Sequence, residues 1–287
     1  MLKFTKMQGL GNDYVYVDCT KKEIDNPEII SKIISNRHFG VGSDGLILIC
    51  NSEVADFKMR MFNSDGSEAE MCGNGIRCVG KYVYDKGLTN KKEITIETLS
   101  GIKKLILFVR NEKVDMVSVD MGKPLLKPED IPVLSDKYPV KNLILNSNGK
   151  DFNFTCLSVG NPHAVTVVDD IDNFDVSKYG KDLENNKVFP KKSNIEFIEI
   201  IDRNHIKMRV WERGAGETLS CGSGACAAVY ACYLNDLVDD KVIVKLLGGN
   251  LYIELDDNNH INMIGKADIV FDGNLYLDEK KLIKRRN

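Results

Sequence analysis

The sequence of 287 residues predicts an α+β protein made of two homologous domains, each with strands wrapped around a central helix. Three observations predict this fold. The chain repeats itself at a fixed offset, each half holds short strands with alternating apolar side chains, and each half contains one helix that follows Cys-Gly-x-Gly. A helix that is apolar on every side must be buried, and surrounding strands are the simplest cover for it.

The internal repeat becomes visible when the sequence is shifted by 149 residues. FKMRMFNSDGSEAEMCGNG (57–75) then lies over IKMRVWERGAGETLSCGSG (206–224), with seven of nineteen positions identical. The same shift aligns two further pairs of segments: 11–18 with 160–167, and 45–49 with 194–198. Because three separated segments share one offset, duplication of a whole domain explains the pattern better than chance. The period is too long for a solenoid.

The elements follow in the same order in both halves. Strands are expected at 14–17 and 164–168, and again where each half carries Lys-Met-Arg, followed by turns at 63–66 and 213–216. Helices are then expected from Gly75 and from Gly224. The second helix is apolar on all sides, so it should be buried, and the first is more mixed.

The domain boundary is expected in a stretch that holds Pro124, Pro128 and Pro132. We therefore expect residues 1–122 to form the first domain, completed by the C-terminal segment 265–287. Residues 123–264 should form the second domain. The basic run near the end of the chain, from Lys280 to Arg286, is interpreted as a solvated tail or a last helix.

Composition and charge exclude several classes of protein. The net charge of −3 gives no reason to expect binding to nucleic acid, and no stretch is long and apolar enough to span a membrane. The N-terminal residues lack the apolar core of a signal peptide, so we expect a cytoplasmic protein. Eight cysteines without any C-x-x-C pair favour neither a disulfide scaffold nor a metal site, and no metal is expected.

Two of these cysteines, Cys72 and Cys221, stand immediately before the helices. The first turn of a helix has unpaired N–H groups and partial positive charge, so it can bind a carboxylate, and glycines allow the ligand a close approach. The same charge should stabilise a thiolate and lower the pKa of both thiols below the value of about 8.5 for a free cysteine.

A pair of such thiols predicts a specific reaction. If both act on one substrate, its carboxylate meets two helix N-termini and its α-carbon lies between two sulfurs. One thiolate can remove the α-proton and the other thiol can return a proton to the opposite face, which needs no cofactor. The remaining cysteines are interpreted as structural: Cys19, Cys50, Cys78, Cys156, Cys226 and Cys232.

Four motifs together resemble the diaminopimelate epimerase family: KMQGLGNDYVYVD, RMFNSDGSEAEMCGNGIRC, SVGNPHAV and VWERGAGETLSCGSGACA. The resemblance covers the whole chain, with the motifs in order. It implies two domains, each a barrel-like, mainly antiparallel sheet around a central helix. It also implies interconversion of LL- and meso-2,6-diaminopimelate without pyridoxal phosphate or metal, in the synthesis of lysine and cell-wall precursors. A homodimer is plausible by the same resemblance.

The resemblance also implies roles for individual residues. Cys72 is similar to the proton donor and Cys221 to the proton acceptor in the LL-to-meso direction. Gly73-Asn74 and Gly222-Ser223 resemble the cradle of the α-carboxylate. His163 and Glu212 match positions that support the acid–base pair. The other substrate contacts implied by the family are Asn12, Asn63, Asn161, Asn194, Glu212 and Arg213, of which Arg213 suits a distal carboxylate and Glu212 an ammonium group.

One position departs from the family pattern, because Gly45 stands where many members carry glutamine. Two alternative functions remain open from the residues alone. One is another two-thiol racemase that acts on proline, hydroxyproline or histidine, for which Glu212 and Arg213 would have little use. The other is a binding or redox-switch protein in which the two thiols form a disulfide. The only expected partner is a small-molecule substrate, with no nucleic acid and no membrane.

Overall fold

The computed structural model describes residues 1–276 of the chain. The expected basic tail and the end of the segment 265–287 therefore lie outside the described residues. The contacts divide the chain into two units, Met1–Val119 with the stretch from Gly265 onward, and Asp120–Ile264. The second unit begins at Asp120, so the proline-containing stretch belongs to unit 2.

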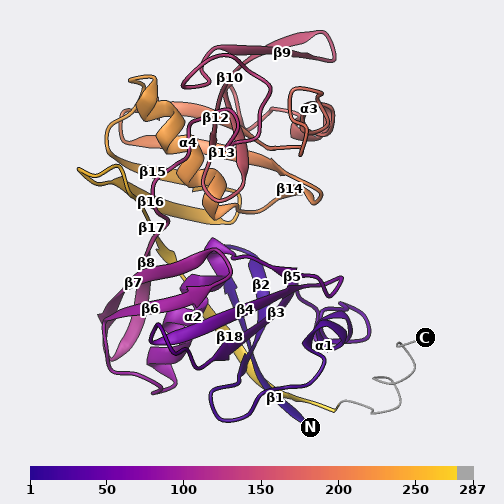
Figure 1. The fold of residues 1–287 in the computed structure, drawn as a ribbon, viewed down its shortest axis with the longest axis vertical. Coiled ribbons are helices and arrows are strands. Elements are labelled where there is room, and N and C mark those ends of the chain that lie inside the picture. The colour runs from indigo at the N-terminus through magenta and orange to yellow at the C-terminus, as the bar shows by residue number, and fades with distance from the viewer. Residues whose placement is uncertain (277–287) are drawn as a thin grey trace. The chain divides into compact units, whose positions relative to one another are not determined.

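Unit 1 contains two helices and a set of short strands (Figure 1). Its elements in chain order are β1 Leu2–Gly9, β2 Asn12–Asp18, α1 Pro27–Ile34, β3 Gly45–Cys50, β4 Phe57–Asn63, β5 Glu68–Ala69, α2 Gly73–Asp85, β6 Glu93–Thr98, β7 Gly101–Arg110, β8 Lys113–Asp120 and β18 Asp268–Leu275.

The strands of unit 1 follow one another around α2. Their order is β18-β1-β2-β3-β4-β6-β7-β8, with the short β5 paired to β4. Only the pairs β2/β3 and β4/β6 are parallel. The helix contacts β1, β2 and β18 and also β7, which lies toward the other end of this order, so the sheet wraps around it (Figure 1).

Unit 2 repeats the same sequence of elements. They are β9 Leu143–Ser147, β10 Lys150–Ser158, β11 Pro162–Val167, α3 Val176–Glu184, β12 Asn194–Asp202, β13 His205–Glu212, β14 Gly216–Thr218, α4 Gly222–Leu234, β15 Lys241–Leu246, β16 Gly249–Leu255 and β17 Ile261–Lys266. The strand order is β9-β10-β11-β12-β13-β15-β16-β17, again with two parallel pairs, β11/β12 and β13/β15.

The duplication extends to the register of the strands. Tyr14 pairs with Gly45 between β2 and β3, and the residues 149 positions later, His163 and Asn194, pair between β11 and β12. In the same way, the partners across β3/β4 recur across β12/β13. The predicted fold class is therefore confirmed: the chain is an α+β protein of two similar units, each mainly antiparallel.

The central helices differ in character, as their sequences predict. In α4, every residue from Gly224 to Cys232 is buried, and apolar side chains face all directions. The helix contacts strands from β10 to β16. In α2, the buried residues include Arg77, so this helix is more mixed. Both helices end without a basic residue in the last turn, and tertiary burial stabilises them.

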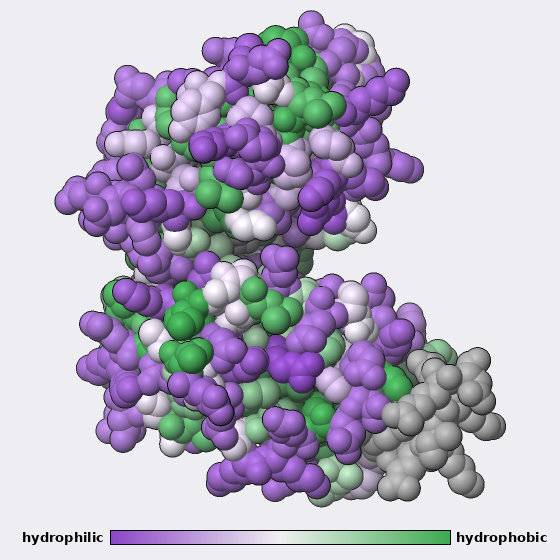
Figure 2. All heavy atoms as spheres, in the orientation of Figure 1, coloured by the Kyte–Doolittle hydropathy of each residue, from purple (hydrophilic) through white to green (hydrophobic). Residues whose placement is uncertain are grey.

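The smaller helices cover the outside of the sheets. In unit 2, α3 packs on β12 and β13, where Gly180 leaves room for the indole of Trp211: a Cβ at Gly180 would lie 2.5 Å from the Cβ of Trp211. The Trp211 side chain packs on the core, and its Nε1 donates to Glu184 at 2.9 Å. On the face shown in Figure 2, hydrophilic residues cover most of each unit. Over the described residues, no helix has the length and apolar character needed to cross a membrane.

Candidate functional site

In unit 1, Cys72 occupies the N-cap of α2. Its backbone is extended, with φ −128° and ψ 121°, and its sulfur accepts the N–H of Gly75 at 3.3 Å. The thiol donates to Oδ1 of Asn12, with 3.1 Å between sulfur and oxygen. The glycine-rich start of the helix thus places a half-buried sulfur over the first helical turn, where a carboxylate could also bind.

The residues around this thiol are held by their own hydrogen bonds. Asn12 donates from Nδ2 to Asp44 at 2.7 Å. Asn74 is buried, and its Oδ1 accepts from Arg77 at 2.9 Å. Asn63 ends β4 and donates to the hydroxyl of Ser67 at 3.0 Å. Of these residues, Asn12 contacts the thiol of Cys72 directly, whereas Gly73 and Asn74 are the first two residues of the helix that follows it.

In unit 2, Cys221 has the equivalent place at the N-cap of α4. Its φ and ψ are −124° and 112°, and its sulfur accepts the N–H of Gly224 at 3.3 Å. The hydroxyl of Ser223 lies 3.6 Å from the sulfur. Gly222 opens the helix. The side chain is more enclosed than its counterpart in unit 1, because Cys221 is only 6% exposed.

The expected lowering of the pKa by the helix N-terminus is wrong for Cys221. Burial raises the pKa of this thiol well above its usual value, and the carboxylates of Glu212 and Glu196 raise it further. The hydrogen bonds from Ser223 and Gly224 act in the opposite direction and are weaker. Desolvation outweighs the partial charge of the helix because the thiolate would lose nearly all of its hydration. Cys221 is therefore a thiol at neutral pH.

His163 lies in β11 and belongs to a buried polar chain. Its Nδ1 is 2.6 Å from Oε1 of Glu196 in β12, and its Nε2 is 2.8 Å from Oδ1 of Asn161. Neither His163 nor Glu196 has any exposed side-chain surface. Glu196 was not among the residues that sequence reasoning selected. A signal was present, because an acidic residue in the middle of the apolar run NIEFI is unusual for a buried strand.

Asn194 is buried at the start of β12 and connects two segments. Its Nδ2 donates to the carbonyl of Pro162 at 3.0 Å, and its Oδ1 accepts the backbone N–H of Arg213 at 2.9 Å. The turn that carries Glu212 and Arg213 is thereby fixed to β11. The Glu212 carboxylate accepts a hydrogen bond from Thr218, and the exposed guanidinium of Arg213 donates to the Lys191 carbonyl at 3.2 Å.

Gly45 is the counterpart of Asn194 in unit 1, and here the two units differ. A Cβ at Gly45 would lie 2.2 Å from the carbonyl oxygen of Phe62. The strands β3 and β4 therefore approach too closely at this point for any side chain. In unit 2, the same position carries a side chain that makes two hydrogen bonds.

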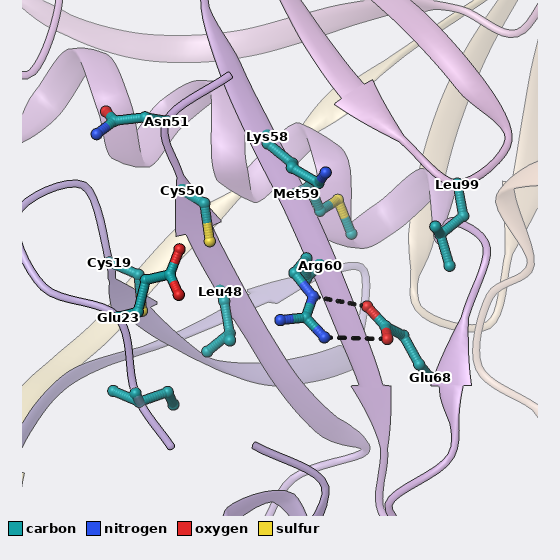
Figure 3. Close-up of a pocket in the computed structure, with 11 residues that line it drawn as sticks. Cys19, Glu23, Leu48, Cys50, Asn51, Lys58, Met59, Arg60, Glu68 and Leu99 are labelled. Atoms are coloured by element: carbon teal, nitrogen blue, oxygen red, sulfur yellow. Dashed lines mark hydrogen bonds and ion pairs between the residues drawn. The ribbon is translucent and has the colours of Figure 1, made fainter. Parts of the chain in front are cut away.

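A separate hollow in unit 1 contains two of the other cysteines (Figure 3). Cys19 follows the end of β2 and Cys50 ends β3, whereas Asn12 begins β2, about 20 Å away along the strand. A hydrogen bond with the Cys19 thiol lowers the pKa of Cys50, and the guanidinium of Arg60 adds to this effect. Arg60 itself is paired with Glu68 at 2.8 Å.

Comparison with known proteins identifies a family. The family model described as diaminopimelate epimerase matches residues 4–127 and 155–270. A diaminopimelate epimerase from Methanococcus maripaludis strain S2 is 59% identical over 275 residues, which is 96% of this chain and 99% of that protein. Another, from Acetivibrio thermocellus, is 58% identical over 279 residues, 97% of this chain and all of that protein.

Among solved structures, the fold is shared with a hydroxyproline epimerase from Agrobacterium vitis, which was solved with bound trans-4-hydroxy-L-proline. The TM-score is 0.70, with 12% sequence identity, over 96% of this chain and 91% of the other. At this identity the likeness concerns the fold alone. The similarity in sequence, by contrast, extends over nearly the full length of the diaminopimelate epimerases.

Proposed function

The chain belongs to the diaminopimelate epimerase family and is an epimerase, and we propose that it interconverts LL- and meso-2,6-diaminopimelate by proton transfer between two thiols. In the LL-to-meso direction, the Cys221 thiolate removes the α-proton. The thiol of Cys72 then delivers a proton to the opposite face of the carbon. After one turnover, Cys221 carries the proton that it removed and Cys72 has lost one, and exchange with solvent restores both sulfurs. In the reverse direction the two sulfurs exchange roles.

One observation carries this proposal: both units place a cysteine at the N-cap of the central helix, with closely similar backbone angles. In each case the sulfur accepts the N–H of the glycine three residues later at 3.3 Å. A structural cysteine has no need of this position in both copies of a duplicated fold. Because the backbone holds the two thiols in the same way, they suit a reaction in which a proton leaves one face of a carbon and another proton arrives at the opposite face.

The helix N-termini supply the electrostatic part of the mechanism. Removal of the α-proton leaves a carbanion whose charge spreads onto the α-carboxylate. The N–H groups of Gly73 and Asn74 in α2, and of Gly222 and Ser223 in α4, are the proposed hydrogen-bond donors to that carboxylate. Because these donors are fixed by the helices before the substrate binds, little reorganisation is required as charge develops.

Cys221 requires a base nearby, because burial holds it in the thiol form. Glu212 is close enough to raise the pKa of the sulfur, and His163 is linked to the same region through Glu196. We assign Glu212 the role of accepting and returning the thiol proton as the substrate binds, and His163 the role of supporting this exchange through Glu196. A thiol that becomes a thiolate only with substrate present is protected from oxidation in the resting enzyme.

The distal end of the substrate distinguishes diaminopimelate from simpler amino acids. The exposed guanidinium of Arg213 is the proposed partner of the distal carboxylate, and Glu212 that of an ammonium group. Asn12, Asn63 and Asn161 are the proposed polar contacts along the substrate. Asn194 contributes through the turn that it holds, because the nitrogen and the oxygen of its side-chain amide both form hydrogen bonds within the protein.

The cellular setting is proposed from the chain's chemistry. All eight cysteines are free thiols, which suits the reducing cytoplasm. The proposed reaction gives the protein a place in the synthesis of lysine and peptidoglycan precursors. A homodimer is proposed as well. Apolar side chains on the outer face of β7, Ile102, Ile106 and Phe108, are 42–50% exposed and would be covered in a dimer, which sedimentation of the intact protein would reveal.

The experiment that tests the proposed reaction is α-hydrogen exchange in D2O with reductant present. LL-diaminopimelate should gain deuterium together with the formation of the meso isomer. Proline, trans-4-hydroxyproline and histidine, run in parallel, should exchange little. Exchange on one of those amino acids but not on diaminopimelate would keep the two-thiol mechanism and reject the role of Arg213. Absence of exchange on every substrate in fully reduced protein would reject the mechanism.

A further inference from the structure

We propose that Glu196 is a positioning residue for the reaction: its buried carboxylate orients the imidazole of His163 and shares one proton with it beneath Cys221. The inference rests on the proposed function, because it gives Glu196 a purpose only if Cys221 exchanges a proton with substrate. Glu196 itself touches neither the substrate nor the reacting carbon. It would act through the ring of His163 and through its own charge.

The burial of Glu196 is costly and calls for an explanation. The residue lies in β12 between Val165 of β11 and Val210 of β13, its partners in the neighbouring strands. Its side chain is completely buried, and Oε2 has no hydrogen-bond partner. Burial raises the pKa of the carboxyl, against the opposing influence of His163. Buried carboxyl groups of this kind are destabilising unless they are paired, and they concentrate at functional sites.

The hydrogen bonds of His163 indicate which atoms of His163 and Glu196 carry hydrogens. Oδ1 of Asn161 can only accept, so the Nε2 atom that lies 2.8 Å from it carries a hydrogen. The contact of 2.6 Å between Nδ1 and Oε1 of Glu196 then needs a second proton, carried by either atom. Glu196 and His163 together thus hold that proton in a pair of zero net charge. Loss of the proton would leave a negative charge in the core.

The pair lies directly beneath the first turn of α4. A Cβ placed on Gly224 would be 2.9 Å from Oε1 of Glu196 and 3.2 Å from the sulfur of Cys221, so both atoms face the same small space. The ionisable groups that face this sulfur within unit 2 are Glu196 from β12 and Glu212 from β13. The charge on Glu196 therefore bears directly on the ionisation of Cys221.

The duplicated unit shows that the fold does not require this carboxylate. The repeat places Tyr14 where unit 2 has His163, and Ile47 where it has Glu196. A Cβ on Gly75 would lie 2.7 Å from Cδ1 of Ile47, so the isoleucine fills the equivalent space beneath α2. A hydrocarbon side chain thus serves the structural purpose in one unit. The buried carboxylate in the other unit is a local addition beside one thiol.

The test is Glu196→Gln in the full-length protein, with Glu199→Gln as the matched control. Glu199 lies in the same strand and accepts a backbone N–H from Ile171 at 3.1 Å. The first readout is turnover across pH. The second is alkylation of Cys221 by iodoacetamide across pH, followed peptide by peptide, with Cys50 as the internal reference thiol.

We expect Glu196→Gln to lower turnover by about tenfold or more at neutral pH. The alkylation midpoint of Cys221 should fall by about half a pH unit or more, because the carboxylate, which is the negative end of the neutral pair and the end that faces the sulfur, is lost. Glu199→Gln should leave both unchanged. An unchanged midpoint, whatever the turnover, would reduce Glu196 to a structural role, and unchanged turnover would also overturn the inference.

A measurement without substitution keeps the test independent of folding. In the wild-type protein labelled with 15N-histidine, the spectrum should show a hydrogen on Nε2 of His163, because Oδ1 of Asn161 can only accept. An unprotonated Nε2 would overturn the inference. Neither this spectrum nor the alkylation profile depends on catalysis. If wild-type protein failed to epimerise diaminopimelate, the proposed function would be rejected. The histidine spectrum and the alkylation profile would still test the Glu196–His163 pair, because neither needs turnover.

Discussion

Nδ1 of His163 lies 2.6 Å from Oε1 of Glu196, and both side chains are completely buried in unit 2. The two residues are 33 positions apart in the sequence and meet because β11 and β12 are parallel neighbours. In unit 1, the equivalent pair is Tyr14 and Ile47. The two halves of the protein therefore share a strand register but differ in the side chains at these positions, a histidine and a glutamate in unit 2 and a tyrosine and an isoleucine in unit 1.

The two N-cap thiols should be indispensable for epimerisation. We expect Cys72→Ser and Cys221→Ser each to reduce turnover by about a hundredfold or more, since a hydroxyl is far less acidic than a thiol. Cys78→Ala and Cys226→Ala are the controls, because these cysteines lie inside the same two helices, away from the N-terminus. The controls should keep most of the turnover. Full activity in Cys72→Ser would reject the two-base mechanism.

The raised pKa of Cys221 should appear in the pH dependence of stability. An unfolded thiol loses its proton near pH 8.5, while the folded Cys221 keeps it, so above that pH the folded state binds more protons. The stabilising contribution is fully present below pH 8.5 and declines as pH rises toward the folded pKa. Urea unfolding from pH 7 to pH 10 should therefore show a steeper alkaline loss for wild type than for Cys221→Ala.

Gly75 and Gly224, which each follow a thiol by three residues, should differ in how well they tolerate substitution by alanine. In Gly224→Ala the new Cβ would press on the carboxylate of Glu196, 2.9 Å away, and on the sulfur of Cys221. In Gly75→Ala it would meet the end of the Ile47 side chain, which can move. We expect a loss of turnover of about tenfold or more only in Gly224→Ala. Similar losses in both variants would argue against the special role of the space beneath α4.

Removal of the Asn194 side chain should release the turn that carries Arg213. Asn194→Ala leaves the carbonyl of Pro162 and the N–H of Arg213 unpaired, at a cost of about 1–3 kcal/mol in the free energy of unfolding. KM for diaminopimelate should rise more than kcat falls. Asn194→Asp keeps the acceptor for Arg213, so its KM should lie nearer to that of wild type. A rise in KM equal to that of Asn194→Ala would show that the bond to Arg213 is not what matters.

Much of the fold could be predicted from the sequence, because the duplication is recorded in it. The offset of 149 residues aligns the strands, the turns and the two helix starts, and the structure repeats the same partners in β2/β3 and β11/β12. The burial of α4 could be predicted as well, since its residues are apolar on every side. These features are local patterns, and hydrophobic periodicity records them directly.

The sequence by itself thus determined the duplicated fold, the family and the two cysteines at the helix starts. Only the tertiary structure decided the surroundings of Cys221. Its pKa is raised rather than lowered because burial removes water and strands β12 and β13 bring two carboxylates close. Glu196 became visible for the same reason. Desolvation and charge depend on distances between residues that are remote in the chain, and no local spacing encodes such distances.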